Sequence, residues 1–419
     1  MTALALCGLT AALFALRQNL YLILAVLAAA VYVWIGHGRI EDVIQDMFFS
    51  VDQEILLSVP LFILAGNIMS HGSIARRLIR LARALTAPVP GGLAVATVLS
   101  CAVFAAVSGS STVTLLAIGP IAYPALLENG YSKPFALGAL CSAGTLGIIV
   151  PPSIPLILYG VATRTSITDL FLAGIGPSLL LTALLAGYAF WRNRHLPRGA
   201  WDAVEMRAAL RGSIFALFMP VLILGGIYSG HFTATESAAI AVVYAVLVEL
   251  FVHRDMTLRA LGVPFRETGL LVGALLPILA LAISLNMFLT LERVPQALVE
   301  WLSGLIEGRL TFILVATLLM LAVGCVMEIT PAVLIMGPLL QPLAASYGID
   351  PVHFGIMMIV NLELGYLTPP MGLNIFVAMS AFREDFGTII RAALPFLAIM
   401  LVGLIAVSLL PALSLFLLP

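Results

Sequence analysis

Long apolar runs, separated by short polar segments, follow one another along most of the chain. A helix needs about 20 apolar residues to cross a bilayer, and most of these runs come close to that length. The pattern therefore predicts a series of membrane-crossing helices. We place them at Met1–Leu16, Leu20–Ile35, Ile55–Ser70, Leu170–Trp191, Ser213–Tyr228, Ala234–Val252, Thr268–Leu289 and Ala392–Phe416.

Polar breaks interrupt a further apolar stretch. Gly91–Val107 and Val113–Leu127 flank the sequence SGSST, and neither half spans a bilayer comfortably. We interpret the two halves as a re-entrant hairpin, followed by a crossing helix, Pro134–Ala162, that is broken at Gly147–Pro152. Backbone that leaves the helix at membrane depth has to line a protein-enclosed cavity or bind a ligand. The stretch is therefore predicted to form half of a transport site.

The same arrangement returns 218 residues later. Leu310–Val326 and Ala332–Ala345 flank MEITP, and a helix over Val352–Leu364 is broken at GYLTPPMG and continues at Leu373–Met379. Many residues coincide at this offset without a gap: Thr112 with Thr330, Gly119–Pro120 with Gly337–Pro338, Pro124 with Pro342, Gly130 with Gly348, Gly147 with Gly365, and Pro151–Pro152 with Pro369–Pro370. This is an internal repeat.

The number of crossings between the hairpins sets their relative orientation. A hairpin returns to the side it entered, and five crossings, beginning near residues 134, 170, 213, 234 and 268, separate the two hairpins. Because five is odd, the repeats are inverted. Five arginines place the loop 192–211 in the cytoplasm by the positive-inside rule. The N-terminus is then periplasmic, and the first hairpin enters from the cytoplasm.

Charge and composition narrow the class of protein to which the chain can belong. Hydrophobic residues make up 62% of the 419 residues and charged residues 10%, against about a quarter charged in soluble domains. This composition predicts an all-α polytopic membrane protein, and a net charge of −1 gives no reason to expect nucleic acid. Four arginines in Ser73–Pro90 predict a basic amphipathic helix on a membrane surface. The charged residues of Leu291–Arg309 also predict an interfacial helix. The apolar N-terminus predicts a first membrane span rather than a signal peptide.

The breaks supply chemistry suited to ions. A broken helix exposes amide donors at the start of one half and carbonyl acceptors at the end of the other. Donors suit an anion, and carbonyls with small hydroxyls suit Na+. The first tip offers Ser108, Gly109, Ser110, Ser111 and Thr112. At the second repeat, the polar groups are Glu328, Thr330, Glu363, Thr368 and Asn374.

The sequence is compatible with more than one role for the acidic residues of the second repeat. Glu328 fits a cation ligand, a proton carrier or a salt-bridge partner, and Glu363 fits a structural acceptor equally well. No GxxxxGK[ST] motif and no Ser–His pairing or HExxH helix occurs in the chain. ATP hydrolysis on this chain and enzyme chemistry are therefore not expected. Inverted repeats with broken helices favour a secondary transporter over a channel.

The chain resembles the large membrane (M, DctM-like) subunit of tripartite ATP-independent periplasmic transporters. The resemblance rests on PLFILAGNIMSHGSIARRL at 60–78, SGSST with GP at 108–120, GTLGIIVPPSIPLILYG at 144–160, GIYSGHFTATESAA at 226–239 and GIDPVHFGIMM…GYLTPPMGLN at 348–374. It implies an elevator-type, Na+-driven symport of organic acids, typically carboxylates or sialic acids, at the bacterial inner membrane. It also implies a small membrane subunit (Q, DctQ-like) and a periplasmic substrate-binding protein as separate chains. A binding-protein-independent anion or dicarboxylate transporter is the alternative.

The resemblance also implies two Na+ sites. One lies between the first tip and the first break, at Ser108, Ser110, Ser111, Thr112, Gly147 and Pro151. The other lies between the second tip and the second break, at Glu328, Thr330, Gly365, Thr368 and Pro369. For the substrate carboxylate we expect a place between the tips, with binding residues Ser108, Gly109, Ser110, Thr330 and Asn374.

These assignments divide the chain into a mobile transport part and a scaffold. We predict an N-terminal scaffold with an amphipathic arm (1–90), a first transport repeat (91–165), central scaffold spans (166–267), a span with a second amphipathic arm (268–309), a second transport repeat (310–383) and a C-terminal span (384–419).

Overall fold

Helices make up all the regular structure in the described part of the chain. The computed structural model describes residues 8–9, 12–13, 16, 18, 20–34, 40–303, 306, 308–369 and 372–418. Among these residues, nine helices are long and apolar enough to cross a membrane. The prediction of an all-α polytopic protein is thus confirmed. The predicted crossing Met1–Leu16 lies outside the described residues apart from a few positions, as does Pro370 of the repeat.

The first half of the chain contains the first hairpin and the first broken helix. Its elements are α2 (Leu20–Trp34), α3 (Ile40–Val51), η1 (Glu54–Leu57), α4 (Ser58–His71), α5 (Ile74–Thr86), α6 (Gly92–Ser108), α7 (Ser111–Glu128), α8 (Lys133–Gly144), η2 (Thr145–Ile148), α9 (Ile154–Thr163) and α10 (Ile167–Asn193). The hairpin is α6–α7, and the broken helix is α8–η2–α9. Both fall where the sequence predicts them.

The second half begins with two connecting helices and then repeats the pattern. Its elements are α11 (Ala203–Tyr228), α12 (Ala234–Leu247), the π-helical turn η3 (Val248–Val252), α13 (Gly262–Leu291), α14 (Val294–Ser303), α15 (Arg309–Val326), α16 (Ile329–Ser346), α17 (Pro351–Tyr366), α18 (Leu373–Phe382), α19 (Phe386–Leu409) and α20 (Ala412–Leu415). The second hairpin is α15–α16, and the second broken helix is α17–α18.

The structural repeat is longer than the sequence pattern indicates. Helices α4 to α10 recur as α13 to α19 at an offset of 218, and Ser111–Glu128 matches Ile329–Ser346 end to end. The turns repeat as well, since Gly130 and Gly348 both have positive φ, 81° and 70°. These positions need glycine because L side chains rarely adopt such torsions. The repeat therefore includes one helix before each amphipathic arm and one after each broken helix.

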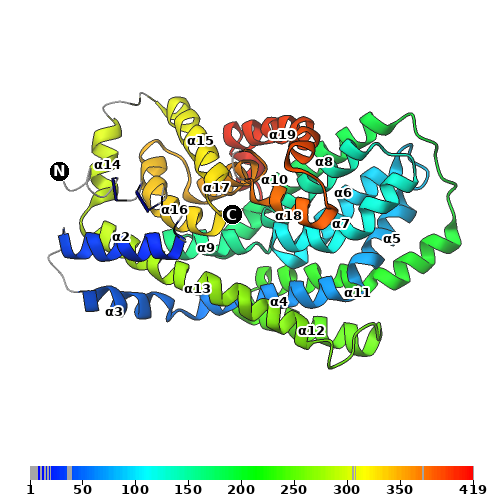
Figure 1. Ribbon diagram of the computed structural model, residues 1–419, viewed down its shortest axis with the longest axis horizontal. Helices are drawn as coiled ribbons and strands as arrows, with labels where there is room; N and C mark the ends of the chain where they lie inside the picture. Colours follow the sequence, from blue (N-terminus) through cyan, green and yellow to red (C-terminus); the bar gives the residue numbers. More distant parts are fainter. Residues whose placement is uncertain are drawn as a thin grey trace.

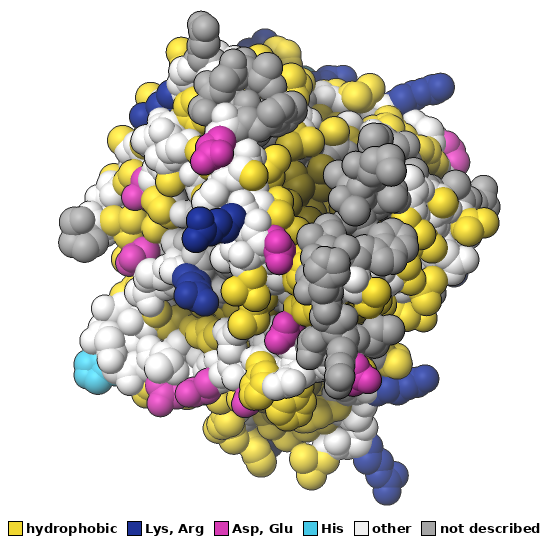
Figure 2. Space-filling view, turned by 90° about the vertical axis from the view of Figure 1, so that its left-hand side faces the viewer, with side chains coloured by type: hydrophobic (Ala, Val, Ile, Leu, Met, Phe, Trp, Pro, Cys, Tyr) yellow, Lys and Arg dark blue, Asp and Glu magenta, His cyan; other side chains and the backbone are white. Residues whose placement is uncertain are grey.

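Two layers organise the molecule (Figure 1). The hairpins and broken helices lie together in the upper part of the view, and α2, α3, α13, α4, α12 and α11 lie beneath them. The lower layer is continuous because α13 packs on α2, α3 and α4, α4 packs on α12, and α12 packs on α11. At the end of the molecule near α2 and α14, hydrophobic side chains reach the surface widely and charged ones are scattered (Figure 2).

The basic arm α5 differs from its predicted setting. Its apolar residues, including Ile74, Leu78 and Leu81, are buried, and the helix packs on α6 and α11. The arginine face forms ion pairs within the protein, from Arg77 to Asp255 at 3.0 Å and from Arg80 to Glu205 at 2.6 Å. The hydrophobic stripe of α5 therefore covers protein rather than lipid. An amphipathic pattern cannot distinguish these two apolar environments.

Helix α11 also begins earlier than predicted, inside the arginine-rich loop. Asp202 caps it, because its carboxylate accepts hydrogen bonds from the amides of Val204 at 2.8 Å and Glu205 at 3.2 Å. A side chain that satisfies the first free amides stabilises a helix start by about 1 kcal/mol. The basic loop is consequently shorter than 192–211.

A polar contact joins the two repeats. Lys133, at the start of α8, pairs with Glu384 between α18 and α19, with 2.7 Å between Nζ and Oε1. The Tyr123 hydroxyl of α7 donates to the same oxygen at 3.2 Å. Helices α7 and α8 are thus tied to the end of the second broken helix.

Candidate functional site

The first hairpin tip is a compact turn. Helix α6 ends at Ser108, Gly109 has a φ of 58°, Ser110 is extended, and α7 starts at Ser111. The Ser108 hydroxyl lies 2.7 Å from the Thr114 hydroxyl, and the Ser110 carbonyl accepts from the Thr114 amide at 3.1 Å. These bonds hold the tip in one shape, so its remaining polar groups are preorganised.

The first break packs directly on this tip. A Cβ on Gly147 would lie 2.3 Å from the Ser110 carbonyl oxygen, and one on Gly109 would lie 2.9 Å from the Pro152 oxygen. The Ile154 amide also donates to the Gly109 carbonyl at 3.4 Å. The structure therefore brings Gly147 of the first break against Ser110 and Ser111 of the first tip, three of the residues predicted for the first site.

The second tip is built differently. Glu328 is the N-cap residue of α16 and Thr330 lies in its first turn. Gly365 of the second break packs on Gly324, where its Cβ would lie 2.6 Å from the Gly324 Cα. Thr368 donates its hydroxyl hydrogen to the Leu364 carbonyl at 2.7 Å. Gly365 of the second break thus contacts the last turn of α15, and Tyr366 of the same break lines one cavity with Glu328 of the tip.

A cavity of about 240 Å³ separates the two tips. Residues 109–113 and 328–331 line it from the tips, and Ile63 of α4 with Leu271, Ala274, Leu275 and Ile278 of α13 form an apolar wall. Pockets for drug-sized ligands start at about 300 Å³. The cavity therefore suits a small solute.

The electrostatics of the cavity are mixed. Helices α7 and α16 both start at its surface, and the free amides of a helix N-terminus carry about half a positive charge. The carboxyl group of Glu328 lines the same cavity and is exposed to it. Among the described residues, no arginine, lysine or histidine side chain lies within ion-pair distance of Glu328. The cavity thus offers dipoles for an anion and a carboxylate for a cation.

The predicted residues do not all reach the cavity. Gly109, Ser110, Ser111, Thr112, Glu328 and Thr330 line it. Ser108 and Asn374 are fully buried and are not part of the lining, and the amide of Asn374 has no hydrogen-bond partner among the described residues. Gly147, Pro151, Gly365, Thr368 and Pro369 lie at the breaks and are not part of the lining.

Sequence reasoning missed the wall and one polar group. Tyr366 lines the cavity beside Glu328; its position inside GYLTPP could have singled it out. The sequence of α13 gives no such indication, because a helix that is apolar on all faces does not show which face lines a cavity. The wall forms only through the packing of α4 and α13 against the tips.

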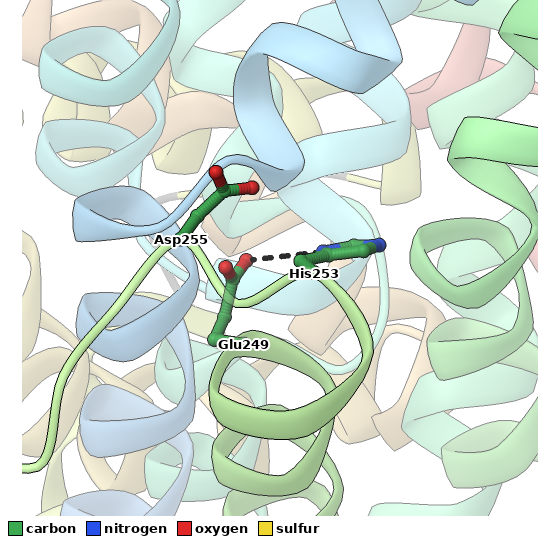
Figure 3. A group of neighbouring side chains, drawn as sticks. All are labelled: Glu249, His253 and Asp255. Carbon is green, nitrogen blue, oxygen red and sulfur yellow. Dashed lines mark ion pairs between the residues drawn. The ribbon is translucent and has the colours of Figure 1, made fainter.

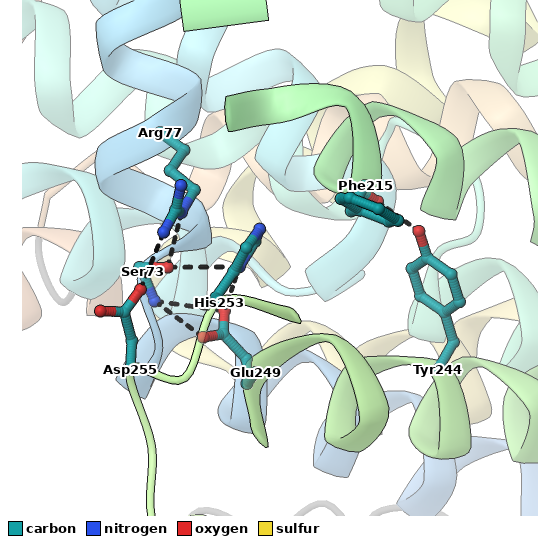
Figure 4. A network of polar contacts seen from close by, with 7 residues as sticks. All are labelled: Ser73, Arg77, Phe215, Tyr244, Glu249, His253 and Asp255. Carbon is teal, nitrogen blue, oxygen red and sulfur yellow. Dashed lines mark hydrogen bonds and ion pairs between the residues drawn. The ribbon is translucent and has the colours of Figure 1, made fainter. Parts of the chain in front are cut away.

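A second polar cluster lies away from the cavity, where α12 meets α5 (Figure 3). Ligand atoms of Glu249, His253 and Asp255 lie within 4.8 Å of one another, and Glu249 is fully buried. These side chains already have protein partners (Figure 4). The Ser73 amide donates to both oxygens of Glu249 at 3.2 Å, and Arg77 donates to Asp255 at 3.0 Å.

This cluster acts as a clamp between helices. The Ser73 hydroxyl and the Arg77 guanidinium hold the pKa of the Asp255 carboxyl below its usual range. A guanidinium in contact with one of the three possible ligands opposes a metal ion there. A Cβ on Gly72 would lie 2.2 Å from the Glu249 carboxyl carbon, so the clamp needs glycine at the turn before α5.

Two opposed hairpins and two broken helices around one small cavity, in a bundle of membrane-length helices, define a membrane transport protein. Residues 7–413 match the family described as "Tripartite ATP-independent periplasmic transporter, DctM component". The chain belongs to this family, as the sequence resemblance predicted. Its characterised relatives are permeases, which agrees with a transporter rather than an enzyme.

Similar proteins cover nearly all of the chain. A C4-dicarboxylate TRAP transporter large permease protein DctM of Pseudomonas aeruginosa is 44% identical over 88% of this chain and 87% of its own. The DctM of Vibrio cholerae is 40% identical over 91% and 89%. The ectoine TRAP transporter large permease protein TeaC of Halomonas elongata is 36% identical over 91% and 90%.

A solved structure shares the fold. The crystal structure of the Alcanivorax borkumensis YdaH transporter superposes with a TM-score of 0.67 over 88% of this chain and 87% of that one, at 14% identity. At this identity the likeness shows the fold alone. Together with the nine membrane-length helices among the described residues, it identifies a multi-pass membrane protein.

Proposed function

We propose that the chain is the transport subunit of a Na+-coupled importer of organic acids. It would work with a small membrane subunit and a periplasmic substrate-binding protein. The observation that carries the proposal is the convergence of two helix N-termini, small hydroxyls and one carboxylate on a single cavity between opposed tips.

The substrate carboxylate is proposed to lie between the tips. There it would meet the first amides of α7 and α16 and the hydroxyls of Ser110 and Thr330, and Gly109 leaves the backbone free of a side chain. Ser108, which directly precedes Gly109, and Asn374 are fully buried. Because three similar permeases are named for C4-dicarboxylates, a C4-dicarboxylate is the first acid to test.

A bound Na+ would compensate the negative charges that meet in this cavity. Two like charges about 4 Å apart repel by about 4 kcal/mol at the effective dielectric of a protein surface, so an anion next to an ionised Glu328 needs a compensating cation. We assign Na+ to the two tip-and-break pairs predicted from the sequence, Ser108–Thr112 with Gly147–Pro151 and Glu328–Thr330 with Gly365–Pro369. Hydroxyl and carbonyl oxygens are suitable hard ligands for it.

Movement is proposed to be of the elevator type. The tips and broken helices would travel as one body, which the Lys133–Glu384 contact supports. The apolar wall from α4 and α13 would belong to the static scaffold that docks the small subunit. The N-terminus would be periplasmic and the loop 192–211 cytoplasmic, in the bacterial inner membrane.

Reconstitution tests this proposal. The chain is placed in liposomes with its small membrane subunit, and uptake of radiolabelled succinate is measured with and without the binding protein and an inward Na+ gradient. We expect uptake only when both are present, with a K+ gradient as the control. Uptake without the binding protein would favour the simpler anion transporter, and uptake without Na+ would contradict the coupling.

A further inference from the structure

A groove lined by arginines runs along the arm α5, away from the candidate site. Arg76, Arg80 and Arg83 recur at intervals of four and three residues, so they share one face of the helix. All three side chains are exposed. Together with Glu205 of α11 they line a groove of about 450 Å³. Positive charge therefore dominates the walls of this groove.

Two of these arginines have no partner within the protein. Arg80 donates to both carboxylate oxygens of Glu205, at 2.6 and 2.8 Å. Arg76 and Arg83 take part in no hydrogen bond or ion pair among the residues that the structure describes. The two are seven residues apart, or about 10 Å along the helix axis. Both guanidinium groups are free to bind an anion in the groove.

An adjoining groove adds to the positive charge of this face. It shares Arg76 and Arg80 with the first groove and is completed by Ser73, Arg77 and Asp255. Arg77 pairs with Asp255 at 3.0 Å (Figure 4). Four arginines thus meet two carboxylates along the two grooves, which leaves a net charge of +2. The unbalanced charge belongs to the two arginines without partners.

The contacts of α5 with α11 set the depth of this face in the membrane. All charged residues of α11 come before Ser213, and the rest of the helix is apolar enough to cross a bilayer. The Ser213 hydroxyl donates to the Arg77 carbonyl at 2.8 Å, and Arg80 pairs with Glu205 in the first turn of α11. The arginines therefore lie along the charged start of α11, just outside the hydrocarbon core, at the depth of the lipid headgroups.

Two exposed tryptophans mark the same depth. Trp191 lies near the end of α10, and Trp201 directly precedes Asp202, the residue that caps α11. Their exposed fractions are 60% and 55%. The Gly199 amide donates to the Ala87 carbonyl at 2.9 Å, so the loop that carries Trp201 lies against the end of α5. Tryptophan is enriched at the level of the headgroups, which agrees with the depth of the arginines.

The chemistry of the groove fits a phosphate group. Guanidinium groups bind phosphate oxygens through paired, charge-assisted hydrogen bonds. At headgroup depth the phosphates of lipids are the most abundant anions, and basic residues there attract lipids with a net negative charge. A zwitterionic headgroup carries an ammonium group, which opposes the net positive charge of the groove. The groove therefore favours an anionic lipid.

We propose that the groove between α5 and α11 binds the headgroup of an anionic phospholipid, with Arg76 and Arg83 donating to its phosphate oxygens. Arg80, held by Glu205 between them, completes the positive wall. Helix α5 leads into the first hairpin, which begins at Gly92. A lipid in this groove holds the arm at the membrane surface where the hairpin starts.

Native mass spectrometry of the purified, delipidated full chain tests the proposal. The chain is titrated with phosphatidylglycerol and with phosphatidylethanolamine that carries the same acyl chains. The wild type should bind phosphatidylglycerol more tightly. The double variant Arg76→Gln with Arg83→Gln should weaken this binding by about 30-fold, since each basic residue near an anionic surface contributes about fivefold. Its melting temperature should stay that of the wild type, because neither arginine has a partner in the fold.

A matched variant separates a site from general charge. Arg259→Gln with Arg266→Gln removes two exposed arginines outside the groove and should bind phosphatidylglycerol as the wild type does. Arg76→Lys with Arg83→Lys keeps the charge and should retain part of the binding. Equal affinity of the wild type for the two lipids, or equal losses in the two glutamine variants, overturns the proposal. Inorganic phosphate that displaces phosphatidylglycerol at equal concentration would overturn the assignment to a lipid.

Discussion

The contact between the first break and the first tip can be tested by adding one methyl group. In Gly147→Ala, the new Cβ would lie 2.3 Å from the Ser110 carbonyl oxygen, 2.5 Å from its carbon and 2.8 Å from the Ser111 nitrogen. All three atoms belong to backbone, so no flexible side chain can move away. The break and the tip must separate.

The expected size of the effect follows from this overlap. Inserting a methyl group into a packed interior costs about 1–3 kcal/mol, and each 1.4 kcal/mol is about a tenfold change in an equilibrium constant. If the strain falls on the Na+-bound state, the Na+ concentration for half-maximal uptake should rise by about 5- to 150-fold. If it falls on folding, the melting temperature should drop instead.

The assay separates these outcomes with a matched control. Succinate uptake into proteoliposomes is measured against Na+ concentration, and thermal unfolding of the purified chain is followed in parallel. Gly187→Ala adds the same methyl group inside α10, where nothing lies within 4 Å. It should transport as the wild type does and melt no lower, because alanine favours a helix over glycine. If Gly147→Ala matches this control in both uptake and melting, the packing of the break on the tip is refuted.

Three further predictions concern contacts outside the cavity. Gly72→Ala places a Cβ 2.2 Å from the Glu249 carboxyl carbon, so its melting temperature should fall, whereas Gly225→Ala, with nothing within 4 Å, should not lower it. Ser73 and Arg77 lower the pKa of Asp255, so the charge of Asp255 stabilises the fold above the ordinary carboxyl pKa, and this contribution is lost as the pH falls through the lowered value. Asp255→Asn should therefore lower the melting temperature at neutral pH. A difference from wild type that does not shrink below about pH 4 would contradict this. Glu384→Gln removes the ion pair to Lys133 and should lower the free energy of unfolding by at most about 1 kcal/mol. A double-mutant cycle with Lys133→Met that gives no coupling energy would show that the pair does not join the repeats.

The sequence predicts the helices and the repeat well, for physical reasons that are local. Apolar length marks a crossing, and glycine and proline mark the places where a helix must end, so the tips at SGSST and MEITP and the breaks before Pro151 and Pro369 fall where expected. The inverted arrangement follows from counting crossings. These features depend on each segment alone, or on the order of segments.

Features that depend on packing between distant segments escape the sequence. The stripe of α5 indicates only that one face is apolar, so its burial against α6 and α11 could not be told from burial in lipid. Glu249 lies in an ordinary apolar helix in the sequence, and its contact with the Ser73 amide joins residues far apart in the chain.

The same limit applies to the site. The residue types at the tips could be selected because small hydroxyls and a carboxylate are unusual at membrane depth. Which of them reach the cavity could not be predicted, and Ser108 and Asn374 are fully buried outside its lining. Tyr366 contributes to the lining through the geometry of the second break.

The tips and breaks are proposed to hold Na+, and the Na+ dependence of succinate uptake tests this assignment most directly. Ser110→Ala removes a hydroxyl from the first tip, and Thr368→Ala removes one from the second break. In the reconstituted transporter with its binding protein, each variant is predicted to need a severalfold higher Na+ concentration for half-maximal uptake. An unchanged Na+ dependence in both variants, at normal expression and melting temperature, would contradict the assignment of Na+ to these residues.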